Sequence, residues 1–295
     1  MLFGLLGNIL TILVVWLRPH MRSSTYLYLS SMAISDLLIL LLLPLDLYKL
    51  WRPRPWPLGD LACKLTMFLS ECCTFCTILH ITFLSLERYV AVCWPITAKT
   101  LVTRRRTRAI IGCLWLGAAV SAAPVLLMVG VEDIGGDEAD RRECRCTQYA
   151  ISSGLLSAMM ILSNLYFLVP LSILGLVYSL IGRTLWLRPK SSRKEQGHRN
   201  TVKMLGVIVL AFVLCWLPFH VGRTIFSLSL DTTAAMTTQN YFNLVSSVLF
   251  YLSAAINPLL YNLMSARYRL AVRSLVLLPL HCCGQFHIVQ QRTAK

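Results

Sequence analysis

The sequence has few charged residues for its length of 295. Asp, Glu, Lys and Arg make up only 14% of it, whereas an average soluble domain contains roughly 25%. Hydrophobic residues make up 56%, and the mean hydropathy is +0.64. This shortage of charge, together with the excess of apolar residues, is typical of an integral membrane protein. The composition therefore argues against a soluble globular domain.

Motifs of several function classes are also missing. The sequence has no His-Glu-x-x-His motif and no carboxylates spaced for acid–base catalysis, so nothing indicates an intramembrane enzyme. It has no internal repeat or interrupted apolar run, which a transporter or channel would carry. The net charge is +15, but no nucleic-acid-binding module is visible. The last apolar run has no Lys that could bind retinal. We expect no enzymatic activity, no metal site, no cofactor and no nucleic-acid partner.

Seven apolar runs are each long enough to cross a bilayer as a helix, which takes about 20 residues. Two stretches, 109–131 and 232–266, hold no charged residue at all. The first run begins at Met1. A cleaved signal peptide is the alternative for it, but no small-residue cleavage site follows and Asn8 lies in its middle. The pattern predicts an all-α membrane protein. The runs span 1–17, 25–50, 62–86, 109–131, 153–182, 203–228 and 239–265.

Positive charge gathers in alternate connections between these runs. Lys and Arg crowd the first, third and fifth connections and the segment after the last run, whereas the fourth connection is acidic. The positive-inside rule places the basic connections in the cytoplasm, so the N-terminus is expected outside. The acidic residues of the fourth connection are Glu132, Asp133, Asp137, Glu138, Asp140 and Glu143.

The sequence contains 11 Cys, most of which lie singly within apolar runs, where Cys usually acts as a small hydrophobe. Cys63 and Cys144 differ, because both fall at the outer ends of connections. The compartment there is oxidising, so a disulfide between them is plausible. Cys146 lies two residues after Cys144 and competes with it as the partner of Cys63.

Ionisable side chains inside the apolar runs indicate functional positions, because burying them in a bilayer is costly. At the inner end of the third run Glu87 can neutralise Arg88, and breaking this pair would expose an Arg that another protein can reach. A structural alternative is an Arg that snorkels to the surface beside its counter-ion. Glu71 lies eight residues after Cys63, about 12 Å down the helix, where a cavity between helices would sit. The other buried charges are Asp36, Asp46 and Arg223.

Five short motifs occur in order along the runs. They are GNIL (7–10), LSSMAISDLL (29–38), ERY (87–89), CWLPFH (215–220) and NPLLY (257–261). Together they resemble the rhodopsin-like (class A) family of G-protein-coupled receptors, and the resemblance covers the whole chain. It implies a seven-transmembrane helix bundle at 1–278, with the first helix truncated at its N-terminus, and a short cytoplasmic tail at 279–295. It also implies a multi-pass plasma-membrane protein with an extracellular N-terminus that binds a heterotrimeric G protein.

The resemblance implies roles for single residues within the bundle. Asp36, with Thr77 and Asn257, would surround an allosteric sodium ion, and a lone protonated Asp is the alternative. Two prolines would each remove a helix hydrogen bond and permit a hinge during activation. The predicted switch residues are Trp216, Pro218, Asn257, Pro258, Tyr261 and Tyr178. The residues expected to meet the G protein are Glu87, Arg88 and Tyr89.

The C-terminal segment ARYRLAVRSLVLL (266–278) resembles the short membrane-parallel eighth helix of this family, and its basic face suits membrane lipid. Cys282 and Cys283 are predicted palmitoylation sites, with free surface thiols as the alternative. Few Ser or Thr hydroxyls follow Met264, so we expect weak phosphorylation-dependent arrestin binding. They are Ser265, Ser274 and Thr293.

Longer stretches resemble one subfamily, that of the ghrelin and motilin receptors. They are PLDLYKLWRPRPW (44–56), GDLACKL (59–65), TVKML (201–205), CWLPFHVGR (215–223) and FYLSAAINPLLYN (250–262). This resemblance implies a receptor for an acylated peptide hormone of the ghrelin type, signalling mainly through the Gq class of G protein and phospholipase C. A motilin-like or other peptide is the alternative ligand, and a membrane transporter is the alternative from a different class.

Nine residues are predicted to bind the ligand. Glu71 and Arg223 match a pair that bridges helices three and six in the subfamily and divides the cavity into a polar and an apolar side. Two buried opposite charges at similar depth should pair. Two departures from the subfamily are Met67 in place of Gln and Ser247 in place of Phe. His198 lies where many rhodopsin-like receptors have an acid facing Arg88, so we expect the ionic lock between helices three and six to be absent. The predicted ligand-binding residues are Asp46, Lys49, Met67, Glu71, Phe219, His220, Arg223, Asn243 and Phe250.

Overall fold

The computed structural model describes residues 1–52, 54–133, 142–187, 193–228, 233–264 and 268–275. In some of these residues only the backbone is described, and their side chains play no part below. They are 20, 193–195, 197, 198, 201, 204, 223, 226–228, 233–243 and 261–264.

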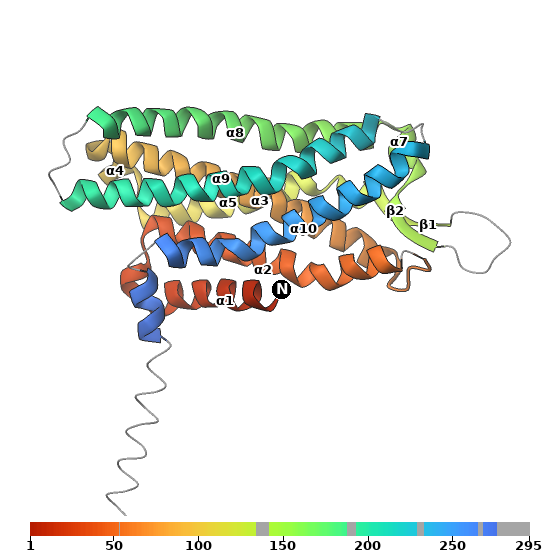
Figure 1. Cartoon of the computed structure of the whole chain (residues 1–295), viewed down its shortest axis with the longest axis horizontal. Helices are drawn as coiled ribbons and strands as arrows, with labels where there is room; N and C mark the ends of the chain where they lie inside the picture. The colour runs from red at the N-terminus through yellow and green to blue at the C-terminus, as the bar shows by residue number, and fades with distance from the viewer. Residues whose placement is uncertain (53, 134–141, 188–192, 229–232, 265–267, 276–295) are drawn as a thin grey trace, which may run out of the picture.

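Seven long helices form the body of the described chain and run along its long axis (Figure 1). Each predicted apolar run falls on one of them, so the seven-helix membrane bundle is confirmed. A helix satisfies its own backbone hydrogen bonds, which is what a chain in lipid requires. Five described helices are long and apolar enough to cross a membrane, and Leu2–Leu17 and Leu244–Leu260 are shorter apolar helices. The seven are α1 (Leu2–Leu17), α2 (Ser24–Trp51), α3 (Gly59–Cys93), α5 (Arg104–Ala122), α8 (Leu155–Leu187), α9 (Arg193–Leu228) and α10 (Thr233–Met264).

The fourth apolar run corrects the prediction of a single helix over 109–131. Helix α5 ends at Ala122, a four-residue helix α6 (Val125–Met128) follows, and Val129–Asp133 forms strand β1. Pro124 lies between the two helices, and its missing N–H interrupts the helical hydrogen-bond ladder. Hydropathy alone did not reveal the change, because a short apolar run suits a buried strand as well as a helix.

Strand β1 pairs antiparallel with β2 (Arg142–Cys146), and this hairpin lies at one end of the bundle together with α7 (Gln148–Ser152) (Figure 1). A disulfide joins Cys63 of α3 to Cys144 of β2, with 5.6 Å between their Cα atoms. The prediction of this disulfide is confirmed, and the competing Cys146 is a free thiol. The opposite end of the bundle carries α4 (Pro95–Leu101), and η1 (Pro19–Met21) links α1 to α2.

The hairpin is also fixed to the start of α3 by polar contacts. The backbone N–H of Val131 donates to Asp60 Oδ1 at 3.0 Å, and the backbone N–H of Trp56 donates to the Arg142 carbonyl at 2.8 Å. Arg54 forms an ion pair with Glu143 at 2.7 Å. The hairpin is therefore held over the outer end of α3, where it covers part of the space between the helices.

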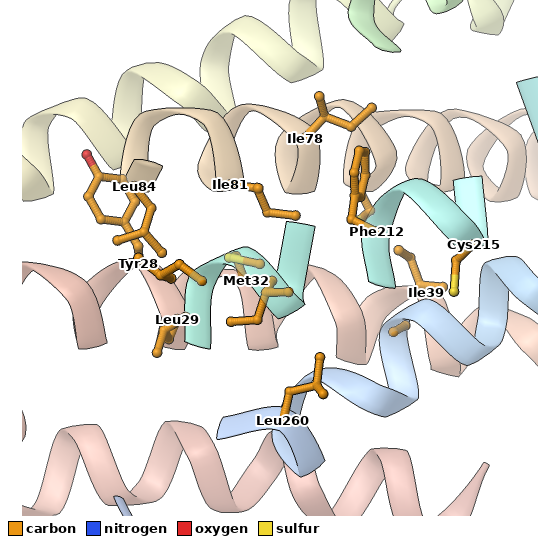
Figure 2. Packing of buried hydrophobic residues seen from close by; sticks show 14 of the residues in the cluster. Tyr28, Leu29, Met32, Ile39, Ile78, Ile81, Leu84, Phe212, Cys215 and Leu260 are labelled. Carbon is orange, nitrogen blue, oxygen red and sulfur yellow. The ribbon is translucent and has the colours of Figure 1, made fainter. Parts of the chain in front are cut away.

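The main apolar core is built from helices that are far apart in the sequence. Figure 2 shows Met32 of α2, Ile81 of α3, Phe212 of α9 and Leu260 of α10 among its side chains. Helix α3 contacts α2, α5, α8 and α9, which makes it the central helix of the bundle. Large apolar side chains also face outward, for example Leu176, which is 63% exposed. Such outward faces suit lipid, whose tails are as apolar as the side chains.

The predicted eighth helix falls partly within the described residues. Residues 268–275 are helical, and their ribbon runs across the long axis of the bundle (Figure 1). Tyr268 Oη and Thr11 Oγ1 share a hydrogen bond of 2.9 Å, and Arg18 donates to the Ser274 carbonyl at 2.8 Å. These contacts fix the segment against α1 and its end, whereas its position relative to a membrane stays a prediction. The predicted palmitoylation sites Cys282 and Cys283 lie outside the described residues.

Candidate functional site

A cavity of about 730 Å³ opens between the parts of α2, α3, α9 and α10 that lie nearer the β1–β2 hairpin. Six of the nine predicted ligand-binding residues line it. They are Asp46, Lys49, Met67, Glu71, Phe219 and Phe250. His220 does not line the cavity but is buried beside it, stacked on Phe167 with 4.5 Å between ring centroids. The side chains of Arg223 and Asn243 lie outside the described set, so the Glu71–Arg223 bridge stays a prediction.

The polar side of the cavity is formed mainly by α2 and α10. Tyr251 donates its phenol proton to Asp46 Oδ2, and this bond ties α10 to α2. The ammonium of Lys49 lies 3.5 Å from Met67 Sδ and 5.6 Å from the centroid of the Trp56 ring. Met67 therefore offers Lys49 a weak sulfur acceptor in place of the amide that the subfamily resemblance led us to expect. The cavity presents both a carboxylate and a cation to a polar ligand.

The apolar side of the cavity was only partly predicted. Leu47 of α2 and Val248 of α10 line it, together with Met128 of α6 and Val129 of β1. Neither of the latter two could be placed from the sequence, because the fourth run was predicted as a plain helix with no turn back over α3. Most of the wall is apolar, with few polar groups, which is the composition of a typical ligand site.

Tyr251 is the clearest functional residue that sequence reasoning missed. It follows Phe250, a predicted ligand residue, and its phenol donates a hydrogen bond to Asp46 in the described part of the chain. Two features of the sequence could have indicated it. Tyr251 lies in the stretch FYLSAAINPLLYN, and its separation of six residues from Asn257 places it above the polar centre of the same helix.

The floor of the cavity is an aromatic cluster around Trp216, which is 1% exposed. The Trp216 ring meets Phe250 edge-on at 5.1 Å and Phe219 edge-on at 5.9 Å. Phe219 and Phe250 stack at 6.0 Å, and Ser247 lines the cavity on the same helix as Phe250. Two cavity-lining rings therefore touch Trp216 directly, which gives a packed route from the cavity toward the middle of α9, where Pro218 lies within the helix.

The three predicted sodium residues gather from α2, α3 and α10 near the centre of the bundle. Asp36 is 2% exposed, and its Oδ2 accepts a hydrogen bond of 2.9 Å from Asn257. The neighbouring Ser35 shares a hydrogen bond of 2.9 Å with Thr77. A buried carboxylate, an amide and two hydroxyls offer hard oxygen ligands, which fit an alkali-metal ion. Within the described residues no cluster of His, Cys, Asp and Glu could hold a transition metal.

At the inner end of α3, Glu87 has other partners than the one proposed from the sequence. Its Oε1 accepts hydrogen bonds from Tyr28 of α2 and Thr107 of α5, each at 3.2 Å. Among the described residues no ion pair joins Glu87 to Arg88, although their charges still interact, so the neutralised pair stays a prediction.

Two further predicted residues, Tyr178 and Tyr89, lie near the C-terminal end of α3. Tyr178 shares a hydrogen bond of 3.3 Å with Ser85, one turn above Arg88. Tyr89 packs on a small apolar cluster that includes Val177. Pro258 is buried within α10. The side chains of Tyr261 and His198 lie outside the described set, so the expected loss of an ionic lock between helices three and six stays a prediction.

Comparison with known proteins gives one family and a close set of relatives. The family model for the seven-transmembrane receptors (rhodopsin family) matches residues 7–261. The chain is 54% identical to growth hormone secretagogue receptor type 1 of Sus scrofa over 282 residues, which cover 92% of this chain and 77% of that receptor. It is 53% identical to the Homo sapiens receptor of the same name over 278 residues, which cover 91% and 76%. The Homo sapiens motilin receptor is 44% identical over 323 residues, which cover 93% and 78%.

Proposed function

The chain belongs to the rhodopsin family of seven-transmembrane receptors, and from this premise we propose that it binds an acylated peptide hormone of the ghrelin type. A receptor of this family is a multi-pass membrane protein that couples to G proteins and is not an enzyme. We further propose the Gq class of G protein with phospholipase C as its effector, the plasma membrane as its location, and an extracellular N-terminus. A motilin-like or other related peptide is the second candidate ligand, because the motilin receptor is 44% identical.

The observation that carries this proposal is the two-sided cavity. Asp46, Lys49 and Glu71 give its wall charges of both signs, which suits the polar groups of a peptide end. Leu47, Val248 and their apolar neighbours form a wall that suits an acyl chain. An acyl chain gains roughly 0.8 kcal/mol for each CH₂ that it buries. A peptide without the chain would lose that gain while keeping its polar contacts.

The same cavity supports a route for signalling. A ligand that touches Phe219 or Phe250 moves rings that are packed on Trp216. Because Pro218 lies within α9 and Pro258 within α10, these helices have weakened points in their hydrogen-bond ladders at which they can hinge. We propose that ligand binding favours an open state in which the G protein meets Arg88 and Tyr89. The ligand shifts that equilibrium only by its difference in affinity for the two states.

The first test is inositol phosphate accumulation in cells that express this chain, with Arg88→Ala as the control for coupling. Acyl ghrelin, its des-acyl form and motilin would be added separately, and surface protein would be measured in the same cells. We expect a response to acyl ghrelin that is at least about tenfold more sensitive than the response to the des-acyl form, since a few buried CH₂ groups account for such a ratio. A chain present at the surface but silent to all three ligands would contradict the proposed ligand class.

We also propose that Asp36, Thr77 and Asn257 hold a sodium ion when the receptor rests. An ion that binds the folded receptor stabilises it by mass action. We expect NaCl to raise the thermal unfolding temperature of the purified chain above its value in equimolar KCl. Asp36→Asn keeps a side chain that can meet Asn257 but removes the charge, so it should abolish the difference. Equal unfolding temperatures for the native chain in the two salts would contradict the sodium site.

The proposal has three further parts. They are weak arrestin binding, palmitoylation of Cys282 and Cys283, and lipid contact through the basic face of 266–278. They rest on the sequence and on the helical residues 268–275. Mass spectrometry of the hydroxylamine-treated and untreated chain would test the palmitoylation, because hydroxylamine cleaves thioesters. We expect a mass loss of up to two acyl groups, located at Cys282 and Cys283, and an unchanged mass would contradict this.

A further inference from the structure

Glu87 is bound by two helices other than its own. Its Oε1 accepts from the Tyr28 phenol and from the Thr107 hydroxyl, each at 3.2 Å. Thr107 is fully buried, and its Oγ1 is also hydrogen-bonded to Ser24 Oγ at 2.9 Å, so α2 supports both groups that hold the carboxylate. A hydrogen bond to a carboxylate is stronger than one between neutral groups. The Glu87 side chain is thus directed toward α2 and α5.

Arg88, the next residue, forms no ion pair with this carboxylate among the described residues, although the two charges interact. Two polar atoms of the pair are buried without a hydrogen-bond partner in the described part of the chain, namely Glu87 Oε2 and Arg88 Nε. Adjacent Glu and Arg side chains are long enough to meet at a helix surface, and each here has an unused atom to offer. The contacts to Tyr28 and Thr107 are therefore what oppose a direct Glu87–Arg88 pair.

We propose that Tyr28 and Thr107 are positioning residues for Arg88. They hold Glu87 toward α2 and α5, so the guanidinium of Arg88 is available to the G protein instead of being bound by its neighbour. Without the Tyr28 phenol, Glu87 turns to Arg88 and restrains it. Thr107 contributes less, because a hydroxyl donates one proton at a time and Ser24 lies within reach of the same group. The functional half of this inference rests on the proposed coupling role of Arg88.

A thermal-unfolding cycle tests the positioning without any ligand or G protein. Glu87→Gln, Arg88→Gln and the double variant would be compared in the native chain and again in Tyr28→Phe. We expect only a small deviation from additivity in the native chain, because the two charges interact there without forming an ion pair. In Tyr28→Phe the deviation should grow by about 2 °C or more, because a direct pair can then form. Equal deviations in both backgrounds would overturn the proposal.

A nucleotide-exchange assay tests the consequence for coupling. The chain, reconstituted in lipid bilayer discs with a Gq heterotrimer, would be measured without ligand and with acyl ghrelin. Tyr28→Phe should lower exchange on the order of tenfold to a hundredfold, the range of one hydrogen bond to a charged group. Adding Glu87→Gln to Tyr28→Phe should raise exchange to the level of Glu87→Gln alone, because the competing charge is gone. A loss caused only by damaged packing would not be rescued, and that result would overturn the proposal.

Tyr166→Phe is the matched control. Its phenol forms an interhelical hydrogen bond of 2.6 Å with Ser121, away from Arg88, so it should leave exchange unchanged. Thr107→Val should show a smaller loss than Tyr28→Phe. If the native chain exchanges no faster than Arg88→Ala under either condition, the proposed function fails. The thermal cycle still decides whether Tyr28 keeps Glu87 from Arg88.

Discussion

Asn8 shows how single polar residues are accommodated inside this bundle. It is fully buried on α1, and its amide donates to the Gly4 carbonyl and to the Ala254 carbonyl of α10, each at 3.0 Å. Trp115 similarly donates to Ser31 at 2.9 Å across α5 and α2. In lipid the helices gain little from burying apolar surface against one another, so such contacts help to select which helices meet. Polar residues in the apolar runs therefore indicate where one helix contacts another.

His80 differs from Asn8 because one of its buried polar atoms has no hydrogen-bond partner among the described residues. It is fully buried on α3, its Nδ1 is bonded to the Cys76 carbonyl at 2.7 Å, and its Nε2 has no hydrogen-bond partner among the described residues. A buried unsatisfied polar atom costs roughly 1–3 kcal/mol. His80→Leu keeps a similar volume and removes that atom, so we expect the thermal unfolding temperature to rise by a few degrees.

Trp115→Phe is the control for this substitution, because it removes a partly buried polar group that is hydrogen-bonded to Ser31. We expect it to lower the unfolding temperature. Both variants would be measured in the same detergent without ligand. A fall in the unfolding temperature of His80→Leu would mean that His80 Nε2 has a partner, for example a buried water molecule.

The β1–β2 hairpin is the element that the sequence did not predict, and it contributes Val129 to the cavity wall. The contact between Asp60 and Val131 and the disulfide between Cys63 and Cys144 hold it over α3. In the sequence, its charged residues indicate only an acidic connection between the fourth and fifth apolar runs. Strand pairing depends on a partner elsewhere in the chain, so no local periodicity could show that residues 129–133 leave the helix.

The disulfide of this hairpin should be important for stability, and the nearby free thiol should not. Cys63 and Cys144 are 81 residues apart in sequence, and a disulfide usually stabilises by about 2–4 kcal/mol. We expect Cys63→Ser to lower the unfolding temperature by several degrees. We also expect it to weaken ligand binding, because the hairpin, which forms part of the cavity wall, is then held less firmly. Cys146→Ser should leave both unchanged.

Cys146 should also react slowly with thiol reagents. Burial raises the pKa of its thiol, and the Glu132 carboxylate adds to this, so less reactive thiolate is present at neutral pH. Measuring maleimide labelling of the folded chain as a function of pH would check this, and labelling should accelerate only as the pH rises above the usual thiol range.

If Cys146→Ser lowered the unfolding temperature as much as Cys63→Ser, the Cys63–Cys144 pairing would be contradicted.

At the scale of the whole molecule, the two ends of the bundle differ in character. The hairpin and the Arg54–Glu143 ion pair lie at one end, and α4 with the Arg-rich start of α5 lies at the other (Figure 1). Arg104, Arg105 and Arg106 are exposed there. Because basic residues stay in the cytoplasm, we expect the hairpin end to face outside.

Lysine labelling tests this orientation. Lys64 lies at the hairpin end with a side chain 34% exposed, and Lys99 is exposed on α4 at the opposite end. A membrane-impermeant amine reagent added to intact cells should modify Lys64, and Lys99 should be modified only after permeabilisation. Lys64→Arg and Lys99→Arg identify the labelled peptides. Modification of Lys99 in intact cells would contradict the orientation.

The sequence by itself determined that seven apolar helices form a membrane bundle, because length and hydropathy along the chain suffice for that. It also identified six residues that line the cavity, among them Asp46 and Phe250, through the motifs that they accompany. The positions of the cysteines in the connections left Cys63 with two candidate disulfide partners, Cys144 and Cys146.

Only the tertiary structure decided which side chains meet across helices. It brought Tyr251 to Asp46, placed Val129 in the cavity wall, and directed Glu87 toward Tyr28. These contacts join residues far apart in the chain, and their geometry depends on how the helices are packed and rotated. Hydropathy fixes the existence of a helix but not its rotation, so the partners of a buried carboxylate follow from packing alone.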